Sequence, residues 1–156
     1  MWQRIQTVFL ALVIASMVIS IFLPVWLFAD PQTGVEHQLY PLHYSIVEKG
    51  VKTTTYFPFC IMAMLMVAAA TVAVMELRRY DNRILQIKMG TLNSLVLAGV
   101  MISIVVFSNQ LAKDHVSGWK YGMSLYLAFA GVAFNWLAVR FIRRDEKLVR
   151  DSDRLR

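Results

Sequence analysis

The strongest constraint on this chain is the grouping of its apolar residues into long blocks. The blocks cover residues 7–29, 56–77, 92–111 and 123–139. Each is close to the about 20 apolar residues that a helix needs to cross about 30 Å of hydrocarbon. With 58% hydrophobic and 17% charged residues among 156, the chain is also too apolar for a soluble domain of this length. The sequence therefore predicts an integral membrane protein.

The four blocks predict one membrane domain that covers residues 1–156. With the flanking turns that stand in the headgroup zones included, the predicted spans are about 6–29, 56–77, 84–111 and 119–142. We expect an all-α integral membrane protein in which these spans form an antiparallel four-helix transmembrane bundle.

One connection is long, the predicted outer loop at residues 30–55. It holds two stretches rich in β-branched and aromatic residues, 44–47 and 51–56, with Gly50 between them. Glycine readily adopts the positive φ that a tight hairpin turn requires. The sequence therefore predicts a small β-hairpin in this loop.

Lysine and arginine are distributed unequally between the two sides of the predicted bundle. Twelve fall on the side of the two termini and four on the opposite side. Cytoplasmic segments carry the excess of Lys and Arg in membrane proteins, so we expect both termini in the cytoplasm. The net charge of +6 then reflects topology. No nucleic-acid partner is expected, because acidic residues are interspersed among the basic ones.

The C-terminal segment is strongly charged, with eleven charged residues among the seventeen at 140–156. Opposite charges lie four residues apart, as in Glu146 with Arg150, and such pairs are adjacent on a helix. We expect residues 143–156 to form a helical cytoplasmic tail. This tail is either a solvated helical end that fixes topology or a surface that contacts a partner or anionic lipid headgroups. The candidate contact residues are Arg78, Arg79, Arg83, Arg143, Arg144 and Arg150.

Three polar residues form a candidate intramembrane cluster: Glu76, Asn93 and Asn135. They belong to three predicted spans and lie at similar depth in the cytoplasmic half. Polar groups are costly in lipid, so they mark either interhelical hydrogen bonds or function. We expect hydrogen bonds between the helices, with Glu76 paired to an arginine. A proton or ion path would need a carboxylate nearer the midplane.

Motifs that would indicate catalysis are missing from the sequence. It has no Gly-rich phosphate loop, no recognisable Ser/His/Asp set and no paired catalytic carboxylates, so we expect neither an enzyme nor a cofactor. Soft copper ligands and histidines do occur, at Cys60, Met62, Met64, Met66, His37, His43 and His115. Methionine is also a common apolar filler, and the histidine spacing matches no zinc signature. A small membrane carrier or metal-handling protein is therefore the alternative function.

Three stretches of the sequence together resemble one known family. They are the opening WQRIQTVFLAL, the connection YDNRILQIKMGTLN and the ending FIRRDEKLVRDSDRLR. Along essentially the full chain, the sequence resembles the Bacteroidota inner-membrane family called domain of unknown function 4293 (DUF4293). The resemblance implies a four-span protein of the bacterial inner (plasma) membrane and brings no established activity. The family frequently carries a cysteine where this chain has Gly90, which weakens any thiol function here.

The remaining patterns favour a non-enzymatic accessory or scaffold subunit. Small residues recur at spacing four on the predicted spans, for example Gly90, Ser94 and Ala98, and such surfaces let helices approach closely. The predicted spans also carry few polar groups. We expect the protein to pack against a larger membrane protein or against a second copy of itself, within the lipid bilayer.

Overall fold

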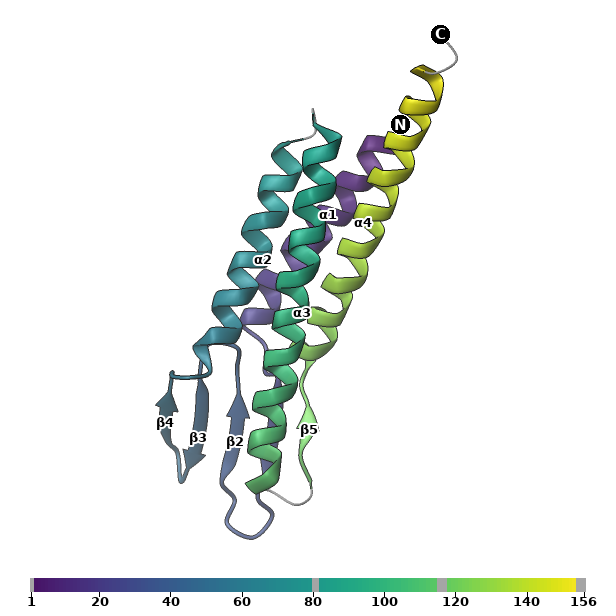
Figure 1. The fold of residues 1–156 in the computed structure, drawn as a ribbon. Helices are drawn as coiled ribbons and strands as arrows, with labels where there is room; N and C mark the ends of the chain where they lie inside the picture. The colour runs from purple at the N-terminus through teal and green to yellow at the C-terminus, as the bar shows by residue number, and fades with distance from the viewer. Residues whose placement is uncertain (1, 80–81, 115–117, 154–156) are drawn as a thin grey trace.

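The computed structural model describes residues 2–79, 82–114 and 118–153 and contains both helices and a β-sheet (Figure 1). Along these residues the elements are α1 (Trp2–Ile21), β1 (Trp26–Ala29), β2 (Glu36–Leu39), β3 (Tyr44–Glu48), β4 (Val51–Thr55), α2 (Cys60–Arg78), α3 (Arg83–Asp114), β5 (Lys120–Tyr121) and α4 (Met123–Asp153).

The helices pack side by side, with α1 and α3 each in contact with both α2 and α4. Their shared core is apolar and includes Met17 of α1, Met66 of α2, Val100 of α3 and Ala128 of α4. The start of α1 and the end of α4 lie at the end of the molecule opposite the sheet (Figure 1).

Three of the helices, α2, α3 and α4, are long and apolar enough to cross a membrane. The apolar part of α1, Ile5–Ile21, is shorter. These lengths and compositions indicate a membrane protein, as the sequence predicted. Three helices have the length and hydropathy of a membrane span, whereas four spans were expected.

The predicted all-α fold with a small hairpin is wrong, because the structure contains a five-stranded antiparallel sheet of order β4-β3-β2-β1-β5. The expected hairpin is its β3–β4 edge, where Lys49 and Gly50 have φ of 47° and 83° in the turn. An isolated two-stranded hairpin is marginally stable in water. In the sheet, β3 of this hairpin also pairs with β2, which supplies further backbone hydrogen bonds.

Two of the additional strands come from segments that the hydropathy pattern assigned to spans. The first predicted span, 6–29, is wrong in its last part, because α1 ends at Ile21 and residues Trp26–Ala29 form β1. Pro24 lies between them and lacks the N–H that a helix interior needs. The fourth predicted span, 119–142, is wrong at its start, where Lys120–Tyr121 form β5 beside β1.

The sheet and the helices share one hydrophobic core. Trp26 of β1 and Leu39 of β2 are fully buried and belong to the same cluster as Met62 of α2 and Ile104 of α3. The 32-residue α3 is longer than the 19-residue α2 and continues past it alongside the sheet (Figure 1). The sheet is therefore packed onto the helical part of the protein.

Helix α4 continues without interruption to Asp153, and its last turns extend beyond the ends of α2 and α3 (Figure 1). Residues 154–156 of the predicted tail lie outside the described residues.

Candidate functional site

The polar residues expected at similar depth are brought together by α2, α3 and α4. Glu76, Asn93 and Asn135 are at most 1% exposed. The Nδ2 of Asn93 donates to Oδ1 of Asn135 at 3.2 Å. The Nδ2 of Asn135 in turn donates to the carbonyl oxygen of Gly90 at 3.1 Å and to Oγ of Ser94 at 2.8 Å. This network joins α3 to α4 inside the packed helices.

Glu76 lies against Gly90, the residue whose carbonyl oxygen accepts from Asn135. A Cβ atom at position 90 would stand 2.9 Å from Oε1 of Glu76 and would overlap the side chain of Val139. Neither carboxyl oxygen of Glu76 has a hydrogen-bond partner among the described residues. Because Gly90 has no side chain, the carboxyl group of Glu76 fits between the three helices.

The expected pairing of Glu76 with an arginine is absent from the described part of the chain. Helical side chains lean toward the N-terminus of their helix. The Glu76 side chain therefore leans toward the interior of the protein, whereas Arg78 and Arg79 are exposed at the end of α2.

Two buried glutamines were not identified from the sequence, and one of them, Gln86, contacts the cluster. Gln86 is 5% exposed, and its Nε2 donates to the carbonyl oxygen of Glu76 at 3.1 Å. Gln6 of α1 is also 5% exposed, and its Nε2 has no hydrogen-bond partner among the residues described. The spacing of Gln86, Gly90 and Asn93 on one face of a helix is the signal that could have identified Gln86.

Some of the candidate arginines connect α3 to α4 at the same end of the helices. The Nη1 of Arg83 lies 3.1 Å from Oδ2 of Asp145 and also donates to its backbone carbonyl oxygen at 3.2 Å. The Nη2 of Arg143 donates to Oγ1 of Thr91 at 3.4 Å. Arg144 and Arg150 are exposed on α4. The base of the C-terminal extension is thus attached to α3.

A groove of about 270 Å³ lies between α3 and α4 beside the buried cluster. Its lining residues are Thr91, Ser94, Trp136, Val139, Arg140 and Arg143. Two of these residues also contact the buried cluster. The Ser94 hydroxyl oxygen accepts from Asn135, and the Val139 side chain lies against Gly90.

Comparison with known proteins places the chain in a family. The profile of a domain of unknown function, DUF4293, matches residues 2–155. The chain belongs to the DUF4293 family. This confirms the family resemblance seen in the sequence. No curated protein matches the sequence.

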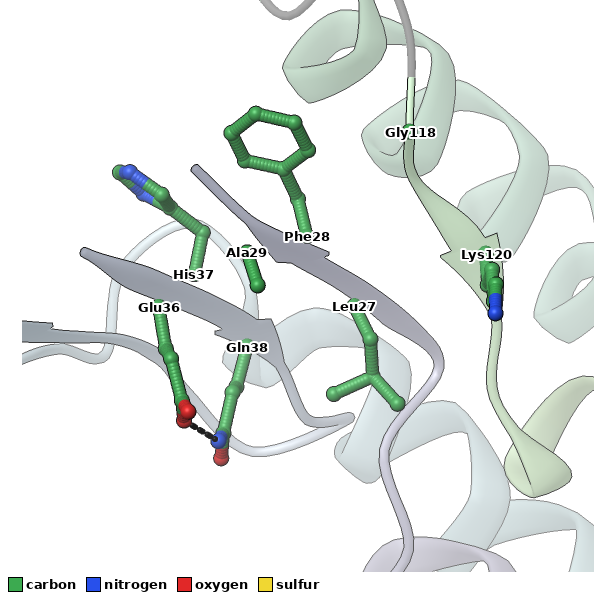
Figure 2. A pocket seen from close by; sticks show the side chains of 8 residues that line it. All are labelled: Leu27, Phe28, Ala29, Glu36, His37, Gln38, Gly118 and Lys120. Atoms are coloured by element: carbon green, nitrogen blue, oxygen red, sulfur yellow. Dashed lines mark hydrogen bonds between the residues drawn. The ribbon is translucent and has the colours of Figure 1, made fainter. Parts of the chain in front are cut away.

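At the other end of this DUF4293 protein, the sheet carries a second pocket, of about 240 Å³ (Figure 2). Its lining residues are Leu27, Phe28, Ala29, Glu36, His37, Gln38, Gly118 and Lys120. Trp26 and Leu27 of β1 pair with β5, and the pocket lies beside the rest of β1, Phe28 and Ala29. Phe28 and His37 point to the same side of the sheet (Figure 2), with ring centroids 5.8 Å apart. The sequence reading did not identify this pocket.

The residues considered for metal handling in this DUF4293 chain are placed in separate surroundings. Met62 and Met66 are fully buried in the apolar core, whereas Met64 is 68% exposed. His37 Nδ1 lies 2.6 Å from the hydroxyl of Tyr44, and His43 stacks on Tyr40. The remaining histidine considered, His115, lies outside the described residues. Where the structure describes the chain, no group of three or more His, Cys, Asp or Glu is placed to hold a metal ion.

Proposed function

We propose that this protein is a non-enzymatic accessory or scaffold subunit that holds a larger membrane protein through its C-terminal helix. The observation that carries the proposal is the extension of α4 beyond the packed helices (Figure 1). Lys147, Leu148 and Arg150 are exposed on this extension, where a partner can reach them.

The extension leaves the protein in a defined direction. Arg83 of α3 holds Asp145 by both its side chain and its backbone. The ring of Phe141 stacks on Phe9 of α1 with centroids 5.6 Å apart. A helix held at its base presents its exposed residues with less loss of conformational entropy on binding than a flexible tail would. The basic residues give such a surface electrostatic specificity.

The proposal includes a bacterial inner membrane, of the kind found in Bacteroidota, with both termini in the cytoplasm. In this arrangement the shorter α1 crosses the membrane beside the three helices that are long and apolar enough to do so. The start of α1 and the end of α4 lie at the same end of the molecule (Figure 1). The excess of Lys and Arg on this side, twelve of sixteen, supports a cytoplasmic location for it.

The proposal is tested by recovering the tagged full-length protein from native membranes in mild detergent and identifying co-purifying proteins by mass spectrometry. We expect one larger membrane protein in stoichiometric amount. The double substitution Lys147→Glu and Arg150→Glu is expected to lower its recovery at least about tenfold, because opposite charges at an interface become like charges.

Lys113→Glu is the matched control, because Lys113 is an exposed lysine in the last turn of α3, next to the sheet. It should leave recovery of the partner unchanged. Recovery of the protein alone or only with copies of itself would contradict the proposal, as would a partner whose recovery is the same with both variants.

A further inference from the structure

The groove between α3 and α4 combines positive charge with an apolar floor. Two of its six lining residues are arginines, two carry hydroxyl groups, and none is acidic. We infer that this groove binds the phosphate group of an anionic membrane phospholipid. This inference goes beyond the proposed scaffold function and uses other residues, since the proposed partner surface consists of Lys147, Leu148 and Arg150.

The arginines are the groups that would hold the phosphate. The Thr91 hydroxyl donates to the carbonyl oxygen of Ile87 and the Ser94 hydroxyl to that of Gly90, so both hydroxyl protons are already used within α3. Each guanidinium has five N–H donors in a planar fork that matches phosphate oxygens. Arg140 and Arg143 are exposed side chains, with donors available for an anion.

Two contacts orient these guanidinium groups toward the groove. Arg143 reaches from α4 to Thr91 of α3, with Nη2 3.4 Å from Oγ1. The Arg140 guanidinium carbon lies 5.2 Å from the centroid of the Trp136 ring, a cation–π contact. A cation–π contact does not consume hydrogen-bond donors, so the exposed Arg140 guanidinium retains N–H groups for an anion. The two cations are therefore held on the same groove in the absence of a ligand.

The apolar surroundings favour a lipid over a free phosphate ion. Val139 forms part of the groove and is 7% exposed, and Trp136 beside it is 57% exposed. Trp136 and Phe129, which is 65% exposed, lie seven residues apart and so on the same face of α4. On α3, Leu95 follows Thr91 by one turn and is 73% exposed. These residues provide an apolar surface for acyl chains below the arginines, in helices that can cross a membrane.

The position along the helices agrees with a headgroup site. Arg140 and Arg143 follow the apolar part of α4, and tryptophan is enriched at the level of lipid headgroups. Basic pockets between membrane helices on the cytoplasmic side are suited to anionic headgroups. A phosphate at the arginines and acyl chains along Leu95 and Phe129 would therefore match the arrangement of a phospholipid in the adjacent leaflet.

The test is a lipid titration of the purified full-length protein in detergent, with bound lipid counted by native mass spectrometry. The probes are phosphatidylglycerol, phosphatidylcholine and inorganic phosphate. We expect phosphatidylglycerol to bind and the other two to bind at least about tenfold more weakly, because a lipid with a net negative charge satisfies both the arginines and the apolar surface.

The decisive variant is Arg140→Gln with Arg143→Gln, and the matched control is Arg78→Gln with Arg79→Gln. Both remove two exposed arginines from the same end of the helices. The groove variant should weaken binding of phosphatidylglycerol at least about tenfold, and the control should leave it unchanged. Arg143→Lys keeps the charge but loses the planar fork, so it should cause a smaller, measurable loss.

Three results would overturn the inference. Equal losses in the groove and control variants would mean that the lipid responds to net charge alone. Unchanged binding in the groove variant would place the lipid elsewhere. Binding of inorganic phosphate as tight as that of phosphatidylglycerol would identify a site for the free anion. Arg143→Lys also keeps the inference testable if the double variant does not fold.

Discussion

At the scale of single residues, the missing side chain at position 90 decides how three helices meet. Gly90 of α3 faces the Glu76 carboxyl group of α2 and the Val139 side chain of α4, and its carbonyl oxygen accepts from Asn135. Sequence reasoning identified Glu76, Asn93 and Asn135 as candidates because polar groups in an apolar block are conspicuous. It also named Gly90 as a position where helices can approach closely, but it could not identify Glu76 and Val139 as the neighbours there, since glycine has no side chain to indicate them.

Gly90→Ala is expected to destabilise the protein. The added Cβ would overlap the Val139 side chain and stand 2.9 Å from Oε1 of Glu76, and overpacking of this kind costs about 1–3 kcal/mol. The measurement is thermal unfolding of the purified protein in detergent.

Gly99→Ala is the matched control in the same helix. Its Cβ would meet only the Leu65 Cδ1 atom, at 3.8 Å, an ordinary contact. Alanine is preferred over glycine in a helix interior by up to about 1 kcal/mol, so this variant should be neutral or more stable. The close approach of the helices at Gly90 would be disproved if the two variants had the same melting temperature.

At the scale of elements, the connection between β2 and β3 contains a titratable group. Tyr40 and His43 exchange two backbone hydrogen bonds there, of 2.8 and 3.2 Å. Burial and, secondarily, the positive charge of Lys52 lower the pKa of His43 below its ordinary value of 6.5. The folded protein therefore favours the neutral imidazole.

We expect the free energy of unfolding to fall as the pH is lowered below 6.5, the ordinary pKa of His43. In this range the unfolded chain binds more protons than the folded one, so protonation favours unfolding. Above that pH both states are neutral at His43, and its contribution to stability is fully present. Melting temperatures measured between about pH 5 and about pH 8 test this expectation, because the unperturbed imidazole titrates between them.

Two variants assign this pH dependence to His43. His43→Gln should reduce the slope below pH 6.5, and Lys52→Gln should reduce it less, because burial is the larger cause of the lowered pKa. A slope that is the same in wild type and His43→Gln would show that other groups govern the acid response.

At the scale of the whole molecule, the protein has a sheet at one end and a charged helical extension at the other (Figure 1). The proposed orientation places the sheet outside the cytoplasm and the end of α4 inside. It also places the proposed lipid groove in the cytoplasmic leaflet. The proposals about partner and lipid therefore share one topological assumption, which a labelling experiment can test separately.

Single cysteines introduced into a Cys60→Ser background test the orientation. A membrane-impermeant maleimide added to spheroplasts should label Lys49→Cys, in the β3–β4 turn, and leave Arg150→Cys unlabelled until the membrane is permeabilised. Both positions are exposed, so a difference in labelling between them cannot result from burial in the protein. Labelling of Arg150→Cys in intact spheroplasts would reverse the proposed topology.

The class of protein and its family follow from the amino-acid sequence alone. Long apolar blocks reflect the free energy of transferring side chains into hydrocarbon, a quantity that depends on composition over a short window. α2 and α3 accordingly occupy the second and third blocks. The family resemblance extends over residues 2–155, so it also needed no knowledge of tertiary contacts.

Tertiary contacts, in contrast, decide which apolar residues form strands and which groups surround Glu76. Trp26–Ala29 has the hydropathy of a span, yet it pairs with β2 and β5, and β5 is almost 100 residues away in the sequence, from Trp26 to its partner Tyr121. Strand pairing depends on hydrogen bonds between distant segments, which no local pattern reports. The surroundings of Glu76 also depend on tertiary contacts, because the packing of α3 and α4 decides which groups its side chain meets.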